Sequence, residues 1–190
     1  MIKANSKTRV AVFISGRGSN LKSLIHHSKL KKSKYSIDLV LSNKLHAKGL
    51  NIAKKNNIRS YTVEQKLNFE KEAIKLVKKF KIRIICLAGF MKILSPDFLN
   101  KVQIPVINIH PSLLPKLKGL NTHERAIKAK HKFTGCTIHY VNSKLDSGKI
   151  ILQKKLKILK SDTPNKLARR VLKLEHAAYP EALDKIAILD

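Results

Sequence analysis

The sequence predicts an α/β fold with a mainly parallel sheet, helices on both of its faces, and an antiparallel hairpin in the C-terminal part. Three apolar runs, at 9–16, 82–90 and 104–110, are typical of strands that are buried on both faces. Segments with helical periodicity lie between the strand-like runs, and this alternation predicts right-handed βαβ units. From residue 134 onward, two strand-like segments follow each other across a short connection, which indicates the hairpin.

The first elements surround a glycine-rich turn. The strand at 9–16 leads through "SGRGSN" into a helix over 21–27, for which Ser19 or Asn20 can supply the N-cap. We then expect a strand, a short helix and another strand, at 36–43, 47–57 and 58–63.

The later elements carry clear start signals. Residues 69–81 have an amphipathic pattern that places five apolar side chains on one helical face: Phe69, Ala73, Leu76, Val77 and Phe80. A helix over 95–102 is predicted to begin with Ser95 as N-cap and Pro96 at its first position. The hairpin strands are expected at 134–141 and 149–158. The final helix should begin at Thr163 and Pro164, and we expect Pro180 to kink or end it.

Length and composition indicate one cytoplasmic domain. With 190 residues and a mass of 21.5 kDa, the chain is expected to form a single domain over 1–190. No apolar stretch approaches membrane-spanning length, and the polar N-terminus lacks the apolar region of a secretory signal. Cys86 and Cys136 lie in separate apolar runs, which is typical of buried thiols in a reducing compartment.

The charge is strongly basic, with 40 Lys and Arg against 12 Asp and Glu and a net charge of +28. Such an excess is typical of proteins that bind nucleic acids or anionic substrates. The lysines are spread over nearly every predicted helix, and only 5% of the residues are aromatic, so a base-stacking surface is poorly supplied. We expect a solvated basic surface and no specific nucleic-acid site. A basic nucleic-acid-binding protein remains the alternative from another class.

The turn "SGRGSN" at 15–20 lies where open α/β sheets bind ligands, between the carboxyl end of a strand and the start of a helix. Gly16 and Gly18 allow a tight turn, and the following amides with Ser19 and Asn20 can bind a phosphate near the positive end of the helix dipole. The third glycine of the dinucleotide fingerprint and the ending of a Walker loop are missing. The turn therefore predicts either a site for one phosphate or an ordinary turn that needs glycine for φ > 0.

The segment "VINIHPSLLP" at 106–115 places an amide and an imidazole at the end of a strand. Because side chains alternate along a strand, Asn108 and His110 share one face while Ile107 and Ile109 face the core. Pro111 ends the strand and fixes His110 at the carboxyl edge of the sheet. The pair could stabilise an oxyanion and move a proton, or it could be a structural Asn beside a half-buried His.

Asp146 lies in the turn "LDSG". Its ordinary role there is to bond its own loop, but a carboxylate near His110 would orient the imidazole for acid–base work. Neither the other histidines nor the cysteines have the spacing of a metal site, so no metal is predicted.

Taken together, the motifs resemble the phosphoribosylglycinamide formyltransferases (GAR transformylases) of purine biosynthesis. The resemblance covers nearly the whole chain through "ISGRGSNL", "LAGFMKILSP", "VINIHPSLLPKLKGL", "GCTIHYV" with "LDSGKIILQ", and "EHAAYP". It implies a Rossmann-like formyltransferase fold, with a ribonucleotide-phosphate-binding half at about 8–110 and a second half at about 111–190. It also implies formyl transfer from the co-substrate 10-formyltetrahydrofolate to the amino group of 5′-phosphoribosylglycinamide, without a metal.

The resemblance assigns residues position by position. His110 would be the proton donor, Asn108 its oxyanion partner, and Asp146 the group that tunes His110. Four residues match the site for phosphoribosylglycinamide: Gly18, Ser19, Asn20 and Glu175. The folate-binding segments correspond to Met91, Lys92, Ile93 and Leu94, to Asn142, Ser143, Lys144, Leu145 and Asp146, and to Asn108. Lys71 is the best alignment to a family arginine near the folate, and Asn121 stands where many members carry His.

Two related enzymes share much of this core. Methionyl-tRNA formyltransferase has a similar Asn-x-His-Pro motif but is expected to need a second, C-terminal domain. Formyltetrahydrofolate deformylase is expected to carry an N-terminal regulatory domain. Both remain alternatives. As partners we expect small-molecule substrates only, no membrane, and a monomer or homodimer.

Overall fold

The computed structural model describes residues 7–64 and 69–187 of the chain. Its centre is a seven-stranded sheet with the order β3-β2-β1-β4-β5-β6-β7. The strands in chain order are β1 (Thr8–Ile14), β2 (Tyr35–Ser42), β3 (Arg59–Thr62), β4 (Ile84–Leu87), β5 (Val106–His110), β6 (Phe133–Tyr140) and β7 (Ile150–Lys157). The first five pair in parallel, while β6 is antiparallel to both β5 and β7. The predicted fold class, hairpin included, is confirmed.

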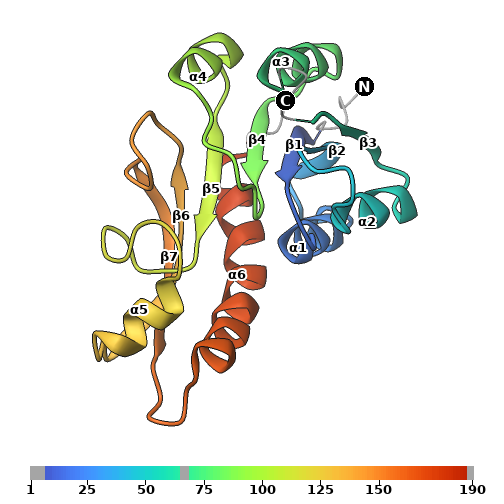
Figure 1. Ribbon diagram of the computed structural model, residues 1–190. Coiled ribbons are helices and arrows are strands. Elements are labelled where there is room, and N and C mark those ends of the chain that lie inside the picture. Colours follow the sequence, from blue (N-terminus) through green and yellow to red (C-terminus); the bar gives the residue numbers. More distant parts are fainter. Residues whose placement is uncertain (1–6, 65–68, 188–190) are drawn as a thin grey trace.

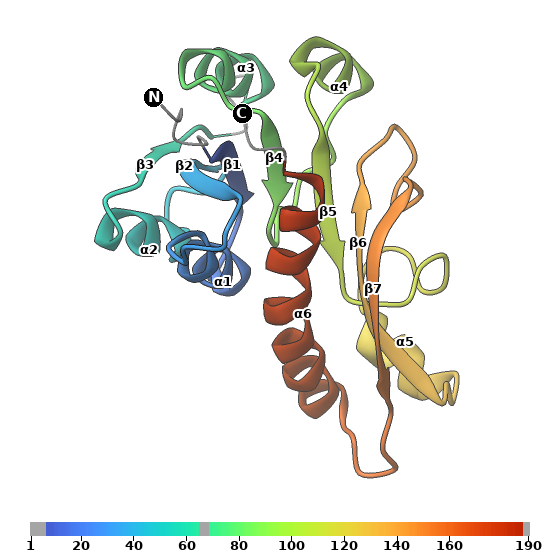
Figure 2. The ribbon, with the colours of Figure 1, turned by 180° about the vertical axis from the view of Figure 1, so that it is seen from behind.

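Six helices accompany this sheet in the described residues: α1 (Ser19–Ser28), α2 (Gly49–Lys55), α3 (Phe69–Lys79), α4 (Pro96–Val102), α5 (Thr122–Lys128) and α6 (Pro164–Ile186). One face of the sheet packs against α1, α2 and α6 around Val10, Val12 and Tyr179. The other face packs against α3 and α4 around Phe13 and Phe98. Figures 1 and 2 show α6 running between α1 on one side and the β6–β7 hairpin on the other. The two sequence halves therefore share one core.

Local sequence signals explain where several helices begin. Ser95 caps α4, its Oγ accepting from the Phe98 amide at 3.0 Å, and Pro96 takes the first helical position. Thr163 caps α6 in the same way, ahead of Pro164. Both starts are confirmed.

Other predictions of local structure were wrong. Neither Ser19 nor Asn20 caps α1: the N-cap is Gly18, in the left-handed region, and among the described residues no side chain caps it. Helix α5 was not predicted; it begins after Asn121, whose φ of 55° is also left-handed.

Helix α6 continues through Pro180 and does not end there. Proline cannot donate to the carbonyl four residues earlier, which belongs to His176. That carbonyl accepts instead from Ser23 Oγ of α1 at 2.5 Å. A contact from a neighbouring helix thus replaces the missing hydrogen bond.

Candidate active site

The structure brings Asn108, His110 and Asp146 together from two different segments. Asn108 and His110 lie on one face of β5, and Asp146 lies in the connection between β6 and β7. His110 Nδ1 is 3.4 Å from Asp146 Oδ2. Both side chains are buried, whereas Asn108 is partly exposed. The short Asp–His distance makes this pair a candidate for acid–base chemistry.

Strand alternation and turn geometry position this cluster. Ile107 and Ile109 pack into the core on the opposite side of β5, which leaves Asn108 and His110 facing Asp146. Asp146 has a φ of 46°, an uncommon conformation for a residue other than glycine. Its Oδ2 also accepts from the Gly119 amide at 2.9 Å, so two separate loops hold the carboxylate.

The second ring nitrogen of His110 faces the loop that follows β5. Its Nε2 lies 2.9 Å from the carbonyl oxygen of Leu117, a residue with a φ of 56°. Both nitrogens of the ring therefore face oxygen acceptors. An N–H at Nε2 donates to Leu117 in this arrangement, and it is the hydrogen-bond donor that a substrate carbonyl could take over.

His139 is a site residue that sequence reasoning missed. It lies directly opposite Asn108 in the antiparallel β5–β6 pairing, with its Nε2 3.4 Å from Asn108 Nδ2. Burial lowers the pKa of His139, so the ring is neutral at pH 7. Since its Nδ1 is 2.9 Å from the Tyr140 carbonyl, Nδ1 carries the proton and Nε2 accepts from Asn108. Asp146 Oδ1 is farther from His139 Nε2, at 3.7 Å. Only the strand register, which no local motif encodes, could have revealed this contact.

The glycine-rich turn packs against the start of α2. Gly18 has a φ of 77°, and a Cβ on it would lie 2.6 Å from the Cα of Gly49. Gly16 has no such constraint: its φ is not positive, and a Cβ there would meet nothing within 4 Å. Within the predicted tight turn, the left-handed glycine is therefore Gly18 and not Gly16.

One predicted phosphate-site residue, Asn20, contacts Glu175 of α6. Asn20 Nδ2 donates to Glu175 Oε2 at 2.8 Å, and both side chains are buried. Asn20 Oδ1 has no hydrogen-bond partner among the described residues, and Ser19 beside it is partly exposed. Burial raises the pKa of Glu175, against the opposing effect of the Asn20 hydrogen bond. An orphaned polar atom at this place is suited to a ligand contact.

Ser15 links this turn to the segment after β4. Its hydroxyl donates to Asn43 Oδ1 at 2.6 Å and accepts from the Met91 amide at 2.8 Å. Asn43 is buried, and its Nδ2 has no partner among the described residues. The hydroxyl group of Ser15 thus connects the turn at 15–20 to the segment at 91–94.

The predicted folate-binding residues divide into exposed and buried ones. Met91 and Ile93 are 67% and 74% exposed, whereas Leu94 is buried in the core. Lys92 Nζ lies 5.6 Å above the Phe69 ring. Residues 142–145 are exposed, with the Lys144 amide bonded to Asn142 Oδ1 at 3.0 Å. Lys71 is exposed on the first turn of α3. The exposed apolar side chains suit contact with a flat organic ligand.

Within residues 7–64 and 69–187, no group of three or more His, Cys, Asp or Glu could hold a metal ion. Cys86 and Cys136 are free thiols, and burial raises the pKa of each to about 12. In the described part of the chain, no helix has both the length and the apolar character needed to cross a bilayer.

Comparison with known proteins gives consistent matches. The family model described as "Formyl transferase" matches residues 8–183. Over 186 residues the chain is 42% identical to the human trifunctional purine biosynthetic protein adenosine-3, a match that covers 95% of this chain and 18% of that protein. It is 38% identical over 176 residues to phosphoribosylglycinamide formyltransferase of Escherichia coli K12, covering 90% and 83% of the two chains. The chain thus spans about a fifth of the length of the trifunctional relatives.

Solved structures agree with these matches. The phosphoribosylglycinamide formyltransferase of Anaplasma phagocytophilum superposes with a TM-score of 0.89 at 43% identity, covering 94% of this chain and 86% of the other. That of Brucella melitensis gives a TM-score of 0.90 at 40% identity, covering 95% of each chain.

Proposed function

The chain belongs to the formyl transferase family, and from this premise we propose that it transfers a formyl group from 10-formyltetrahydrofolate to the amino group of 5′-phosphoribosylglycinamide. The products are N-formyl-GAR and tetrahydrofolate, in de novo purine (IMP) biosynthesis. The observation that carries the proposal is the cluster of Asn108, His110 and Asp146 at the carboxyl end of β5. The names of the relatives supply the acceptor, since they are phosphoribosylglycinamide formyltransferases and purine biosynthetic proteins.

The chemistry requires an oxyanion to be stabilised and a proton to be moved. The amino nitrogen of the acceptor attacks the formyl carbon, and a tetrahedral intermediate forms with its charge on the former carbonyl oxygen. The C–N10 bond of the folate then breaks, the new C–N bond remains, the acceptor nitrogen loses one proton, and N10 gains one. Asn108 donates an amide N–H to the oxyanion, and His110 Nε2–H leaves the Leu117 carbonyl to donate to the intermediate. Asp146 holds the ring through Nδ1 and stabilises the imidazolium.

The substrate phosphate has a suitable place in the turn before α1. The amides of Gly18, Ser19 and Asn20 lie at the N-cap and in the first turn of the ten-residue helix α1, where the dipole favours negative charge. Glu175, bonded to Asn20, contacts the same substrate in this proposal. In this proposal the folate contacts Met91, Lys92 and Ile93 as well as the loop at 142–146 and Asn108. Leu94 anchors the first of these segments in the core. Lys71 is proposed as a more distant folate contact. We also propose that the protein is cytoplasmic and is a monomer or a homodimer.

The proposal is tested with purified protein, 10-formyltetrahydrofolate and phosphoribosylglycinamide. We expect tetrahydrofolate and the formylated product to appear in equal amounts, and His110→Ala to lower kcat/KM by about 10²–10⁴-fold. His26→Ala, at an exposed position of α1, is the matched control and should retain full activity. Absence of formylation by the wild type would reject the function. Parallel assays for formyl-methionyl-tRNA and for free formate would identify the two related activities.

A further inference from the structure

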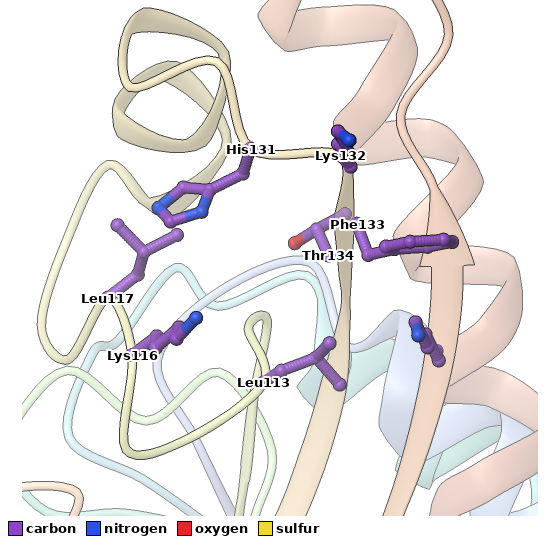
Figure 3. A pocket seen from close by; sticks show the side chains of 8 residues that line it. Leu113, Lys116, Leu117, His131, Lys132, Phe133 and Thr134 are labelled. Carbon is purple, nitrogen blue, oxygen red and sulfur yellow. The ribbon is translucent and has the colours of Figure 1, made fainter.

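We propose that a cavity beside the loop after β5 is a second binding site, for a small organic anion. The cavity lies between this loop and the start of the β6–β7 hairpin and has a volume of about 300 Å³. Eight residues line it: Leu113, Lys116, Leu117, His131, Lys132, Phe133, Thr134 and Lys155 (Figure 3). None of them was assigned to either substrate of the proposed reaction.

The lining selects the chemistry of the ligand. Half of the lining residues are basic, Lys116, His131, Lys132 and Lys155, and none of the eight is acidic. Lys155 Nζ lies 3.8 Å from the centre of the Phe133 ring, so one ammonium group is held in place by the aromatic side chain. Leu113, Leu117 and Phe133 add apolar surface. This combination fits one phosphate or carboxylate group on a small apolar body, and the volume is at the lower end for small-molecule sites.

Thr134 provides an independent sign of a missing partner. The residue is 2% exposed, and its Oγ1 has no hydrogen-bond partner among the described residues. In Figure 3 its oxygen points toward the side on which His131, Leu117 and Lys116 lie. An unpaired buried hydroxyl lowers stability, and an anion in the cavity would accept its hydrogen bond.

The cavity is connected to His110 through its own wall. The side chain of Leu117 lines the cavity, while its carbonyl oxygen is bonded to His110 Nε2 at 2.9 Å. The neighbouring Lys116 carbonyl accepts from Ser112 Oγ at 2.7 Å, which anchors the same stretch of loop. An anion that binds Lys116 and packs on Leu117 stabilises the loop in the conformation that engages the N–H of His110. Binding should therefore slow formyl transfer, a consequence that rests on the proposed function.

Binding itself is tested by calorimetric titration of the full chain with phenyl phosphate, benzoate and, as a neutral analogue, benzyl alcohol. We expect the two anions to bind at least tenfold more tightly than benzyl alcohol, and the stronger of the two identifies the acidic group as phosphate or carboxylate. Thr134→Val should raise the dissociation constant of the more tightly bound anion about tenfold, because one hydrogen bond to a charged group is lost. Lys155→Gln should weaken it too, whereas Lys157→Gln, two residues further on β7 and outside the cavity lining, should not.

Three results would overturn the site: equal binding of the neutral analogue, unchanged affinity in Thr134→Val, or a clear loss of thermal stability in Thr134→Val, which would reveal a structural partner for the hydroxyl. A kinetic measurement then tests the connection to His110. The stronger anion should lower kcat in the wild type, and about tenfold more of it should be needed for the same effect in Thr134→Val. Binding without any change in kcat would overturn the connection. If the chain transfers no formyl group at all, the calorimetric result still decides the binding site.

Discussion

Asn20, in the first turn of α1, donates a hydrogen bond of 2.8 Å to Glu175 of α6, a residue 155 positions later in the chain. The two side chains are buried beside the glycine-rich turn, and each satisfies part of the other's hydrogen-bonding capacity. Because α1 and α6 also pack against each other, the glycine-rich turn and the middle of α6 form one unit. A substitution in either partner should therefore affect both stability and substrate affinity.

Replacing Glu175 by Gln should make stability less dependent on pH. Burial raises the pKa of Glu175, so the fold favours the protonated carboxyl. The corresponding stabilisation is present below the unfolded-state pKa of about 4.3 and is lost as the pH rises through the folded-state pKa, at roughly 1.4 kcal/mol per pKa unit. The Tm of Glu175→Gln should therefore match the wild type near pH 4 and exceed it near pH 8. Glu64→Gln, at an exposed position, serves as control, and a lower Tm for Glu175→Gln at pH 8 would contradict the prediction.

Gly18→Ala and Gly16→Ala should differ sharply although they lie two residues apart. At Gly18 the new methyl group meets the Gly49 backbone, and the φ of 77° is unfavourable for alanine. We expect a loss of about 1–3 kcal/mol in the free energy of unfolding, measured by chemical denaturation. Gly16→Ala has free space and an ordinary φ, so its unfolding free energy should not fall. Equal losses at the two positions would show that the turn has another conformation.

His139→Leu should lower kcat about tenfold while leaving the KM for phosphoribosylglycinamide nearly unchanged. The substitution removes the acceptor that orients the Asn108 amide, and it leaves the glycine-rich turn, the proposed phosphate site, unchanged. His139→Gln keeps an acceptor and should recover part of kcat. His46→Gln, at an exposed position, provides the control, and steady-state kinetics with a Tm for each variant gives the measurement. If His139→Leu lowers Tm as well as kcat, and His139→Gln restores neither, the residue has a purely structural role.

Ser15→Ala should weaken the binding of both substrates. The substitution leaves the Met91 amide and Asn43 Oδ1 without their shared partner. We expect the KM for 10-formyltetrahydrofolate and for phosphoribosylglycinamide each to rise about fivefold, the effect of one hydrogen bond. Ser28→Ala removes a hydroxyl that bonds the Ile25 carbonyl at the end of α1, far from both segments in the hydrogen-bond network described above, and it should change neither constant. If only one KM rises, the hydroxyl does not couple the two segments.

Local signals in the sequence predicted the elements well where a residue acts on its neighbours. Ser95 and Thr163 cap the helices that follow them, and the alternation around Asn108 assigned the two faces of β5 correctly. Predictions failed where a distant contact decides the outcome. Of the two outcomes expected at Pro180, a kink or an end of the helix, the end does not occur: Ser23 of α1 satisfies the carbonyl that Pro180 leaves free, and the helix continues. Helix α5 begins after a left-handed asparagine, which gave no start signal.

The site shows the same division. Motifs selected His110 and Asp146, because strand ends and turns are readable in a sequence. The contact of His139 with Asn108 depends on the register of an antiparallel pair, and the bond between Ser15 and Met91 spans 76 residues. Neither follows from spacing along the chain. The sequence predicted a tight turn with two glycines, but it did not show which of them is required. The Gly49 backbone leaves no room for a Cβ at Gly18, whereas a Cβ at Gly16 would meet nothing within 4 Å, and this contrast decides it.

The position of α6 has a consequence for how the protein is made. Tyr179 of α6 bonds the carbonyls of Leu87 in β4 and Ile107 in β5, and Glu175 bonds Asn20, so α6 covers strands that leave the ribosome much earlier. Until α6 has been synthesised, the nascent chain presents to the surroundings the part of this apolar sheet face that α6 later covers, beside the part that α1 and α2 cover. The contact of Asn20 in the glycine-rich turn with Glu175 can form only then, although the turn is encoded near the start of the chain. During translation, this face is where a chaperone would be expected to bind.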